Sequence, residues 1–172
     1  FAWAAAELAV TTEADSFLTV ASPLDRAPTV PSWGGVRTLG WMTLLEHRAD
    51  LASAVDTAAL TRRFRAFADG LVEGRTGVPY RTVMGHGRNE CVWGSKSVAA
   101  NQAMVLRRAE RLTGDATYRR AALSNLDYLL GRNATGYSFV TGQGEKSPMH
   151  IHHRPSEADT VTAPVPGFLA GG

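Results

Sequence analysis

The sequence predicts an all-α fold built from helical hairpins, followed by a long irregular region. Three observations support this prediction. Apolar residues recur at helical spacing in several segments between residues 1 and 131. The two clearest segments are joined by the short turn Thr113-Gly114-Asp115, which predicts an antiparallel pair of helices. Beyond residue 131 the helical spacing stops, and glycine and proline become frequent.

Composition narrows the class of protein. With 172 residues, 44% of them hydrophobic, and a formal net charge of +2, the chain is expected to form a globular domain rather than a disordered one. The charge balance does not indicate a nucleic-acid partner. No run of about 18 apolar residues indicates a membrane span. The single cysteine, Cys91, excludes an internal disulfide framework and a cysteine-based zinc site.

Four helical segments are expected in the first half of the chain. They cover residues 1–10, 16–21, 32–47 and 57–73. Ser32 follows a proline-rich loop and is expected to cap the third segment, and Gly74 suits the end of the fourth. The fourth segment has the clearest apolar stripe, formed by Leu60, Phe64, Phe67 and Leu71. The first two segments resemble a faint copy of the later hairpin, which suggests stacked helix pairs.

The second half begins with an irregular stretch and continues with the strong hairpin. Within residues 74–90 we expect a short extended piece at 78–83. Helices are expected over residues 95–112 and 116–130. The core-facing residues of these two helices are predicted to be Val98, Val105, Ala109, Leu112, Ala122, Leu126, Leu129 and Leu130.

The tail, residues 132–172, holds three of the five histidines and is the main candidate for a site. Irregular segments of this length in compact domains usually serve a function. The polar cluster His150, His152, His153 and Arg154 offers directional hydrogen-bond donors. Trp93 and Tyr137 add flat apolar faces, and donors beside aromatic planes suit a sugar.

Other interpretations of the tail stay open at this point. His150 and His152 share a face if the backbone is extended and would then favour a metal, although no helical spacing fixes the geometry. Gly142-Gln143-Gly144 lacks the following helix that a phosphate loop requires. The histidines would otherwise simply pin a long loop through backbone hydrogen bonds.

The tail also carries a family resemblance. The matching residues are Ser138-Phe139-Val140-Thr141-Gly142-Gln143-Gly144, Lys146 and Ile151-His152-His153-Arg154. This pattern resembles the histidine signature of glycoside hydrolase family 9, which contains many cellulases. Similar segments precede and follow it in the family order: Trp93-Gly94-Ser95, Asn101-Gln102-Ala103, Leu112-Thr113-Gly114-Asp115, Asp127-Tyr128-Leu129-Leu130-Gly131-Arg132-Asn133 and Pro164-Val165-Pro166-Gly167. The first half agrees more loosely.

The resemblance implies a fold, a reaction and four site residues. The fold would be part of an (α/α)₆ toroid of helix pairs, and the reaction would be hydrolysis of β-1,4-glucans with inversion. His152 would be the signature histidine that contacts sugar near the cleavage point. Arg154 would bind sugar, Trp93 would stack on a glucosyl ring, and Tyr137 would be a weaker substrate-binding residue. No cofactor is implied for this chain; the complete domain could hold calcium, but nothing in this sequence supports it.

The catalytic acid and base are expected to lie outside this chain. The family base sits in an Asp-Ala-Gly-Asp segment, which does not occur here. Asn89-Glu90 has the letters of the acid segment but precedes the histidine motif, so it receives no acid role. We therefore expect residues 1–172 to be an interior part of a catalytic domain, helical over 1–131 and loop-forming over 132–172. Its partner would be a β-glucan, and the full protein would be secreted, although no signal segment is present in this chain.

Three alternatives remain at the level of sequence. The chain could be a non-catalytic carbohydrate-binding remnant that keeps Trp93, His152 and Arg154. A family member acting on glucosamine-containing oligosaccharides would share the same motifs. A helical repeat scaffold without a ligand is the third, and the histidine-rich tail argues against it.

Overall fold

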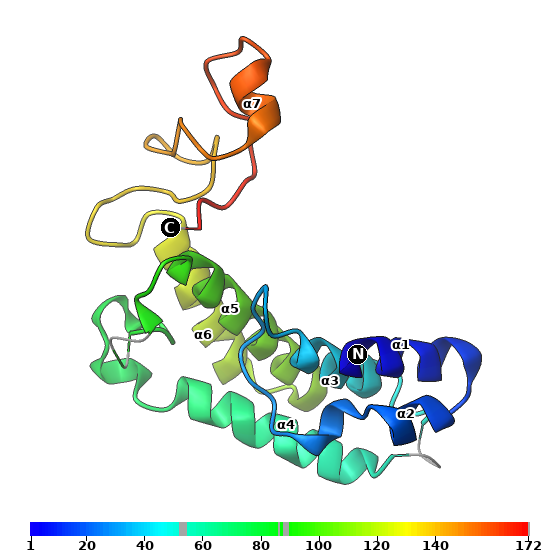
Figure 1. Ribbon diagram of the computed structural model, residues 1–172. Coiled ribbons are helices and arrows are strands. Elements are labelled where there is room, and N and C mark those ends of the chain that lie inside the picture. Colours follow the sequence, from blue (N-terminus) through cyan, green and yellow to red (C-terminus); the bar gives the residue numbers. More distant parts are fainter. Residues whose placement is uncertain (52–54, 86, 88–89, 172) are drawn as a thin grey trace. The chain divides into compact units, whose positions relative to one another are not determined.

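The computed structural model of the chain describes residues 1–51, 55–85, 87 and 90–171. Its helices are α1 Ala2–Thr12, α2 Ser16–Val20, α3 Arg37–Glu46, α4 Thr57–Val72, α5 Ser95–Thr113, α6 Ala116–Leu129 and α7 Arg154–Ala158 (Figure 1). Three 3₁₀ turns accompany them, η1 Pro23–Asp25, η2 Arg75–Gly77 and η3 Pro79–Arg81. The predicted all-α class is confirmed. Among the described helices, none combines the length and hydropathy needed to cross a bilayer.

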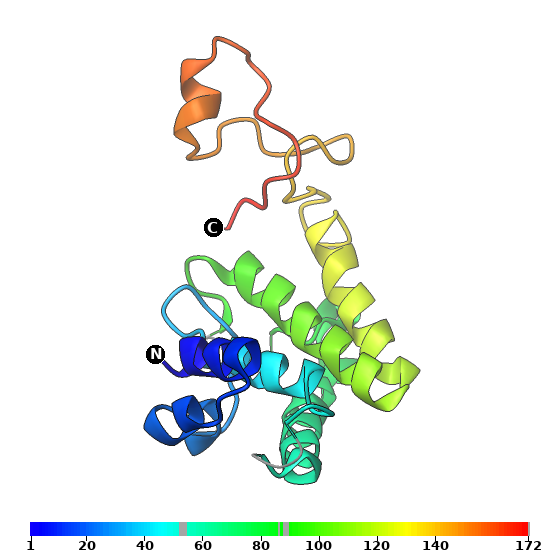
Figure 2. The ribbon, with the colours of Figure 1, turned by 90° about the vertical axis from the view of Figure 1, so that its right-hand side faces the viewer.

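The chain divides into two compact units. Unit 1 consists of Phe1–Glu73 and Val105–Tyr118, and unit 2 of Gly74–Met104 and Arg119–Gly172. The boundary between the units crosses α5 and α6, so each unit contains a part of both helices. The two helices are consecutive along the chain (Figure 2). All four predicted site residues belong to unit 2.

In unit 1, α1 packs closely on α3 because α3 carries a glycine at the contact. A Cβ on Gly40 would lie only 3.1 Å from the Cα of Trp3. The next residue, Trp41, is fully buried, and its indole N–H donates to the Pro23 carbonyl at 2.8 Å. The guanidinium of Arg63 from α4 lies 4.6 Å from the centre of the Trp41 ring. Trp41 is thus a central packing residue of this unit.

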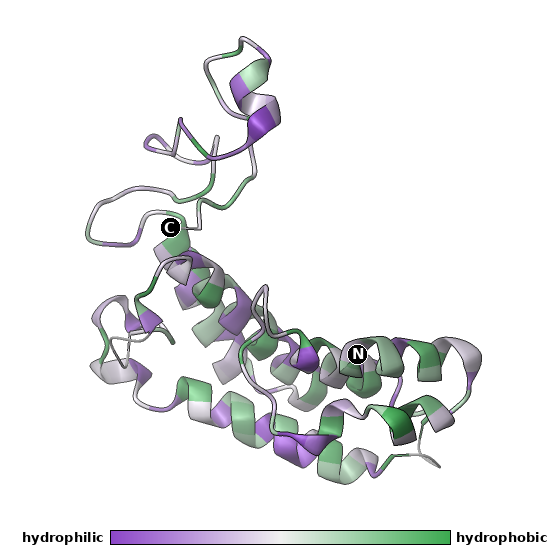
Figure 3. Ribbon diagram, in the orientation of Figure 1, coloured by the Kyte–Doolittle hydropathy of each residue, from purple (hydrophilic) through white to green (hydrophobic). Residues whose placement is uncertain are grey.

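Helix α4 confirms two of the four residues of its predicted stripe, and Phe67 is only partly buried. Asp56 caps it by accepting from the Ala59 N–H at 2.8 Å, and Leu60 and Phe64 are buried. Ala68 is buried as well, whereas Leu71, predicted for the same face, is only partly covered. In Figure 3 the α4 ribbon carries both purple and green residues, as expected for a helix with one wet face.

Polar contacts tie the α5 and α6 residues of unit 1 to its other helices. Arg108 forms an ion pair with Glu46, and burial lowers the pKa of this guanidinium. The Tyr118 hydroxyl donates to the Asp69 carboxylate of α4. Burial, together with Asp69, raises the pKa of Tyr118 to about 12, so this phenol stays protonated at alkaline pH where a free tyrosine ionises.

Two local predictions in the irregular segments are wrong. Helix α3 begins at Arg37 rather than at Ser32, because Ser32 pairs with Gly35 in a tight turn (Ser32 N to Gly35 O, 3.0 Å). Residues 78–83, expected to be extended, contain the turn η3 instead, with Tyr80 in the left-handed region at φ 61°. The Ser124 hydroxyl steadies this strained turn by donating to the Arg81 carbonyl at 2.7 Å.

A buried amide holds unit 2 together. Asn125 of α6 is fully buried, and its Oδ1 accepts from the Val83 N–H at 2.8 Å. Its Nδ2 donates to the Ala99 carbonyl at 2.9 Å and to Gln102 Oε1 at 3.1 Å, both on α5. One side chain therefore joins α6, α5 and the loop that precedes α5.

This amide also explains why the predicted core face of α6 is partly wrong. Leu126 and Leu130, expected in the core, are each 44% exposed, whereas Ser124 and Asn125 are buried. Both polar residues turn inward because they bond to the loop of residues 80–83. Apolar periodicity cannot anticipate such a rotation of the helix face, since the inward residues are polar.

We predict that Asn125→Ala lowers the free energy of unfolding by about 2–4 kcal/mol, because it removes the partner of the buried Val83 N–H and of the buried Gln102 amide oxygen. Chemical denaturation followed by circular dichroism measures the loss. Leu123→Ala on the same helix is the matched control; its side chain is 47% exposed, and its cost should stay below about 1 kcal/mol. Equal losses in the two variants would contradict the role given to Asn125.

Candidate functional site

Antiparallel pairing closes the base of the tail loop. The Thr141 N–H donates to the Phe168 carbonyl at 2.9 Å, and the Ala170 N–H donates to the Phe139 carbonyl at 2.8 Å. Val140 and Leu169 form the isolated bridge between these contacts. Residues 142–166, which include the histidine cluster, therefore form a closed loop with a fixed base.

The side chain of Thr141 strengthens this base. It is fully buried, and its hydroxyl donates to the Val165 carbonyl at 2.7 Å while accepting from the Phe168 N–H at 2.9 Å. Gly142 follows at φ +68°, where a Cβ would lie 2.6 Å from Cβ of Pro166. Only glycine fits there without moving the chain.

Other small residues of the motif also stabilise the loop through hydrogen bonds. Ser138 is buried, and its N–H donates to the Lys146 carbonyl at 2.9 Å. The Gly142 N–H donates to the Ser147 hydroxyl at 3.2 Å. Small residues of the sequence motif thus shape the loop, whereas His152 and Arg154 of the same motif are exposed on it.

His152 and Arg154 lie together where the loop enters α7. Both residues are exposed, and within the described residues neither side chain makes a hydrogen bond or an ion pair. Arg154 is the first residue of α7, a helix that the glycine- and proline-rich composition of the tail did not predict. Pro155 stands in its first turn, where a fixed φ and a missing N–H favour helix initiation.

Trp93 lies beside the end of the tail. Its side chain is 86% exposed, just before the N-terminus of α5. The Lys96 N–H donates to the Gly171 carbonyl at 3.4 Å, which attaches the end of the tail to this segment. Gly172, the last residue of the closing pair of glycines, is outside the described residues.

Tyr137 stands at the start of the tail and is 42% exposed. Its backbone is fixed by Asn133, whose Nδ2 donates to the Tyr137 carbonyl at 2.8 Å. His152 and Arg154 are thus neighbours only through the sequence at the start of α7, and the Trp93 segment is attached to the end of the tail. Within the described part of the chain, no side-chain contact links His152, Arg154, Trp93 and Tyr137 to one another.

A row of aromatic side chains beside the tail was not predicted from the sequence. Tyr80 packs against Tyr128 with ring centres 6.1 Å apart, and Tyr128 against Phe139 at 6.0 Å. The Lys96 ammonium lies 4.7 Å from the centre of the Phe139 ring. Burial raises the pKa of the Tyr128 phenol. The rings come from three segments distant in sequence, so no local pattern indicates them.

The acidic residues near the tail do not assemble into a metal site in the described part of the chain, where no group of three or more His, Cys, Asp or Glu side chains is placed to hold an ion. Glu145 and Glu157 are exposed. Asp159 instead accepts from the Val161 N–H at 2.9 Å, and Glu90 accepts from the Gly85 N–H at 2.6 Å. Asn89, the other half of the Asn-Glu pair, lies outside the described residues.

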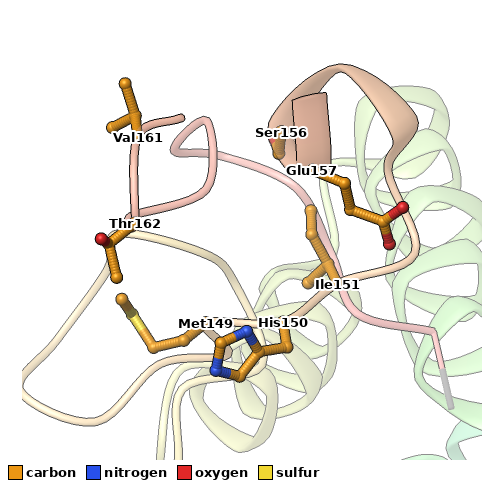
Figure 4. Close-up of a pocket in the computed structure, with 7 residues that line it drawn as sticks. All are labelled: Met149, His150, Ile151, Ser156, Glu157, Val161 and Thr162. Atoms are coloured by element: carbon orange, nitrogen blue, oxygen red, sulfur yellow. The ribbon is translucent and has the colours of Figure 1, made fainter. Parts of the chain in front are cut away.

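A hollow of about 310 Å³ lies inside the tail loop (Figure 4). It is lined by Met149, His150, Ile151, Ser156, Glu157, Val161 and Thr162. His150 therefore faces this hollow of the loop and does not join His152 in a metal-binding cluster.

Comparison with known proteins gives a consistent result. The profile described as glycosyl hydrolase family 9 matches residues 1–172. The xyloglucan-specific endo-beta-1,4-glucanase BoGH9A of Bacteroides ovatus is 38% identical over the whole of this chain, and this chain covers 30% of that protein. Endoglucanase C of Cellulomonas fimi is also 38% identical over the whole chain, which covers 16% of it.

Solved structures agree with the sequence matches. A Bacteroides ovatus GH9 structure superposes with a TM-score of 0.84 at 37% identity, covering 99% of this chain and 32% of its own. The structure of AaCel9A in complex with cellobiose-like isofagomine gives 0.80 at 32% identity, with the same coverage. The predicted fold is thereby confirmed: the helices form part of an (α/α)₆ toroid. The chain spans about a third of the length of these structures.

We predict that Thr141→Val destabilises the tail loop by about 1–2 kcal/mol, because an isosteric methyl removes both hydroxyl contacts and leaves the Val165 carbonyl and the Phe168 N–H without this partner. Amide hydrogen exchange at Phe168 measures local opening, and denaturation measures the global cost. Thr141→Ser should retain most of the stability. Thr162→Val, at an exposed position of the same loop, serves as the control and should change neither quantity. Unchanged exchange at Phe168 in Thr141→Val would contradict the prediction.

Proposed function

The chain belongs to glycosyl hydrolase family 9, and from this premise we propose that it is part of an enzyme that hydrolyses β-1,4-linked glucans with inversion at the anomeric carbon. The observation that carries the proposal is the loop of residues 142–166. Its base is locked by Thr141, and it displays His152 and Arg154 to solvent without partners in the described part of the chain. Side chains held in place yet unpaired are suited to an external ligand.

The proposed roles of His152 and Arg154 follow from their hydrogen-bonding chemistry. An imidazole donates one or two directional bonds, and a guanidinium donates up to five in a planar fork. Sugar hydroxyls offer acceptor oxygens at several directions around the ring. We assign His152 to the sugar at the cleavage point, where hydrogen bonds to the ring hydroxyls strengthen in the transition state. Arg154, two residues further along the chain at the start of α7, would bind the neighbouring hydroxyls.

Trp93 supports the proposal as an aromatic platform. An indole that is 86% exposed has little packing role within this chain, and its flat face matches the C–H face of a glucosyl ring. The attachment of Gly171 to Lys96 keeps this segment next to the tail that carries the histidines. Tyr137, 42% exposed on a fixed backbone, is proposed as a further substrate contact.

The proposed mechanism assigns binding and orientation, but not proton transfer, to this chain. Inverting hydrolysis needs a carboxylate that activates water and a carboxylic acid that protonates the leaving oxygen, about 6.5–9.5 Å apart. No Asp-Ala-Gly-Asp segment occurs in the 172 residues. Glu90, the acid of the Asn-Glu pair, is engaged with the backbone of Gly85. We therefore place both catalytic carboxylates outside this chain.

The proposed substrate is a β-glucan polysaccharide or oligosaccharide. Two similar proteins are named as endoglucanases, one of them xyloglucan-specific, and a similar structure holds a cellobiose-like ligand. Because a polymer of this kind cannot enter a cell intact, we propose that the complete protein acts after secretion.

We predict that the 172-residue chain alone releases no reducing ends from carboxymethylcellulose or xyloglucan, because it has no acid or base to transfer protons. A reducing-sugar assay with the complete protein as positive control tests this. Turnover by the chain alone that a point substitution within it abolishes would refute the placement of the catalytic pair.

In the complete protein, His152→Ala should lower kcat/KM roughly a hundredfold, since it removes a donor that acts in the transition state. His47→Ala, at the C-terminal end of α3 in the other unit, is the matched histidine control and should leave kcat/KM unchanged. Steady-state kinetics on soluble β-glucan measures both variants. Wild-type kinetics in His152→Ala would show that this histidine is not at the site.

A further inference from the structure

His153 lies between the two residues proposed to bind sugar, and its side chain is placed differently from theirs. His152 and Arg154 are exposed, whereas His153 is partly buried. Its Nδ1 lies 2.8 Å from the Ser156 hydroxyl oxygen. Its ring packs on Phe168, with ring centres 4.5 Å apart and planes inclined at 38°. The residue in the middle of the motif thus turns toward the protein while its neighbours face solvent.

Both partners of His153 connect it to the returning limb of the loop. The Ser156 hydroxyl also accepts from the Val165 N–H at 3.3 Å. Phe168 is held at the base of the loop, because its N–H donates to the Thr141 hydroxyl at 2.9 Å. The imidazole therefore links the start of α7 to the opposite limb at one point and to the locked base at another.

The backbone of His153 fixes its neighbours as well. Its N–H donates to the Ile151 carbonyl at 2.8 Å, which closes a tight turn around His152. Its carbonyl accepts from the Glu157 N–H at 3.2 Å, the first bond of α7, the helix that Arg154 opens. A shift of His153 would thus move both exposed side chains at once.

From these contacts we propose that His153 is a positioning residue, which sets the placement of His152 and Arg154 against the sugar without touching the sugar itself. The inference rests on the proposed function of those two residues. Nothing in the described structure assigns any other task to the imidazole, since its Nδ1 and one ring face are occupied by Ser156 and Phe168. Displacing reacting groups by about 1 Å costs up to a hundredfold in rate.

The two contacts of the imidazole can be separated by substitution. His153→Asn retains a polar atom at the place of Nδ1 and loses the ring. His153→Phe retains a ring for Phe168 and loses the polar atom. His153→Ala loses both. Glu157→Gln is the matched control, since its side chain is exposed on the same short helix and the change removes only a charge.

The first test is kinetic and uses the complete protein with soluble β-glucan, at a temperature where circular dichroism shows every variant to be folded. We expect His153→Ala to lower kcat/KM about tenfold, with partial recovery in His153→Asn and His153→Phe and no change in Glu157→Gln. A merely structural role would lower the melting temperature but leave kcat/KM of the folded protein at its wild-type value, and that result would overturn the proposal.

The second test needs no substrate. Backbone ¹⁵N order parameters of His152 and Arg154, measured in the same proteins, should lie near 0.85 in the wild type and fall below about 0.6 in His153→Ala. Order parameters that stay at the wild-type value in His153→Ala would overturn the proposal even if activity fell. If the wild type hydrolyses no β-glucan, the proposed function fails, and the order parameters alone decide whether His153 holds the loop.

Discussion

The buried hydroxyl of Thr141 is the interaction on which the candidate site depends. The hydroxyl accepts a hydrogen bond from the Phe168 N–H and donates one to the Val165 carbonyl. Both partners lie on the returning limb of the tail. A long loop loses much conformational entropy when it is ordered, so its shape must be enforced by contacts at its base. Hydrogen bonds from a buried side chain suit this task, because breaking them leaves a polar group of the interior without a partner.

In the tail, the residues that fix the shape of the loop differ from the residues that the loop exposes to solvent. Small polar side chains and glycines, such as Ser138, Thr141 and Gly142, occupy buried or sterically tight places. The large polar side chains of His152 and Arg154 stay exposed. Elsewhere in unit 2, the buried polar side chain of Asn125 likewise has a structural role, because it bonds to the backbone of Val83 and Ala99. The presence of a polar residue in this sequence therefore does not by itself identify a binding or catalytic residue; its burial must also be known.

Sequence reasoning predicted the helices with strong apolar periodicity and failed where polar contacts decide the structure. The stripe of Leu60 and Phe64 identified α4 correctly. The face of α6 was misjudged at Leu126 because Asn125 turns inward to bond the chain. Helix α7 was missed because its five residues are too short for a periodic signal. The resemblance predicted roles for His152 and Arg154, but only the structure could distinguish the exposed His152 from the packed His153.

The tight approach of Gly142 to Pro166 has a consequence for engineering this fold. The position is closed to every side chain, whereas neighbouring loop residues such as Gln143 and Glu145 are exposed and open to change. A library that varies the exposed positions would sample new surfaces on an unchanged frame. One that includes Gly142 would mostly sample misfolded loops. A position that tolerates only glycine, Gly142, is thus directly followed by one that is open to substitution, Gln143.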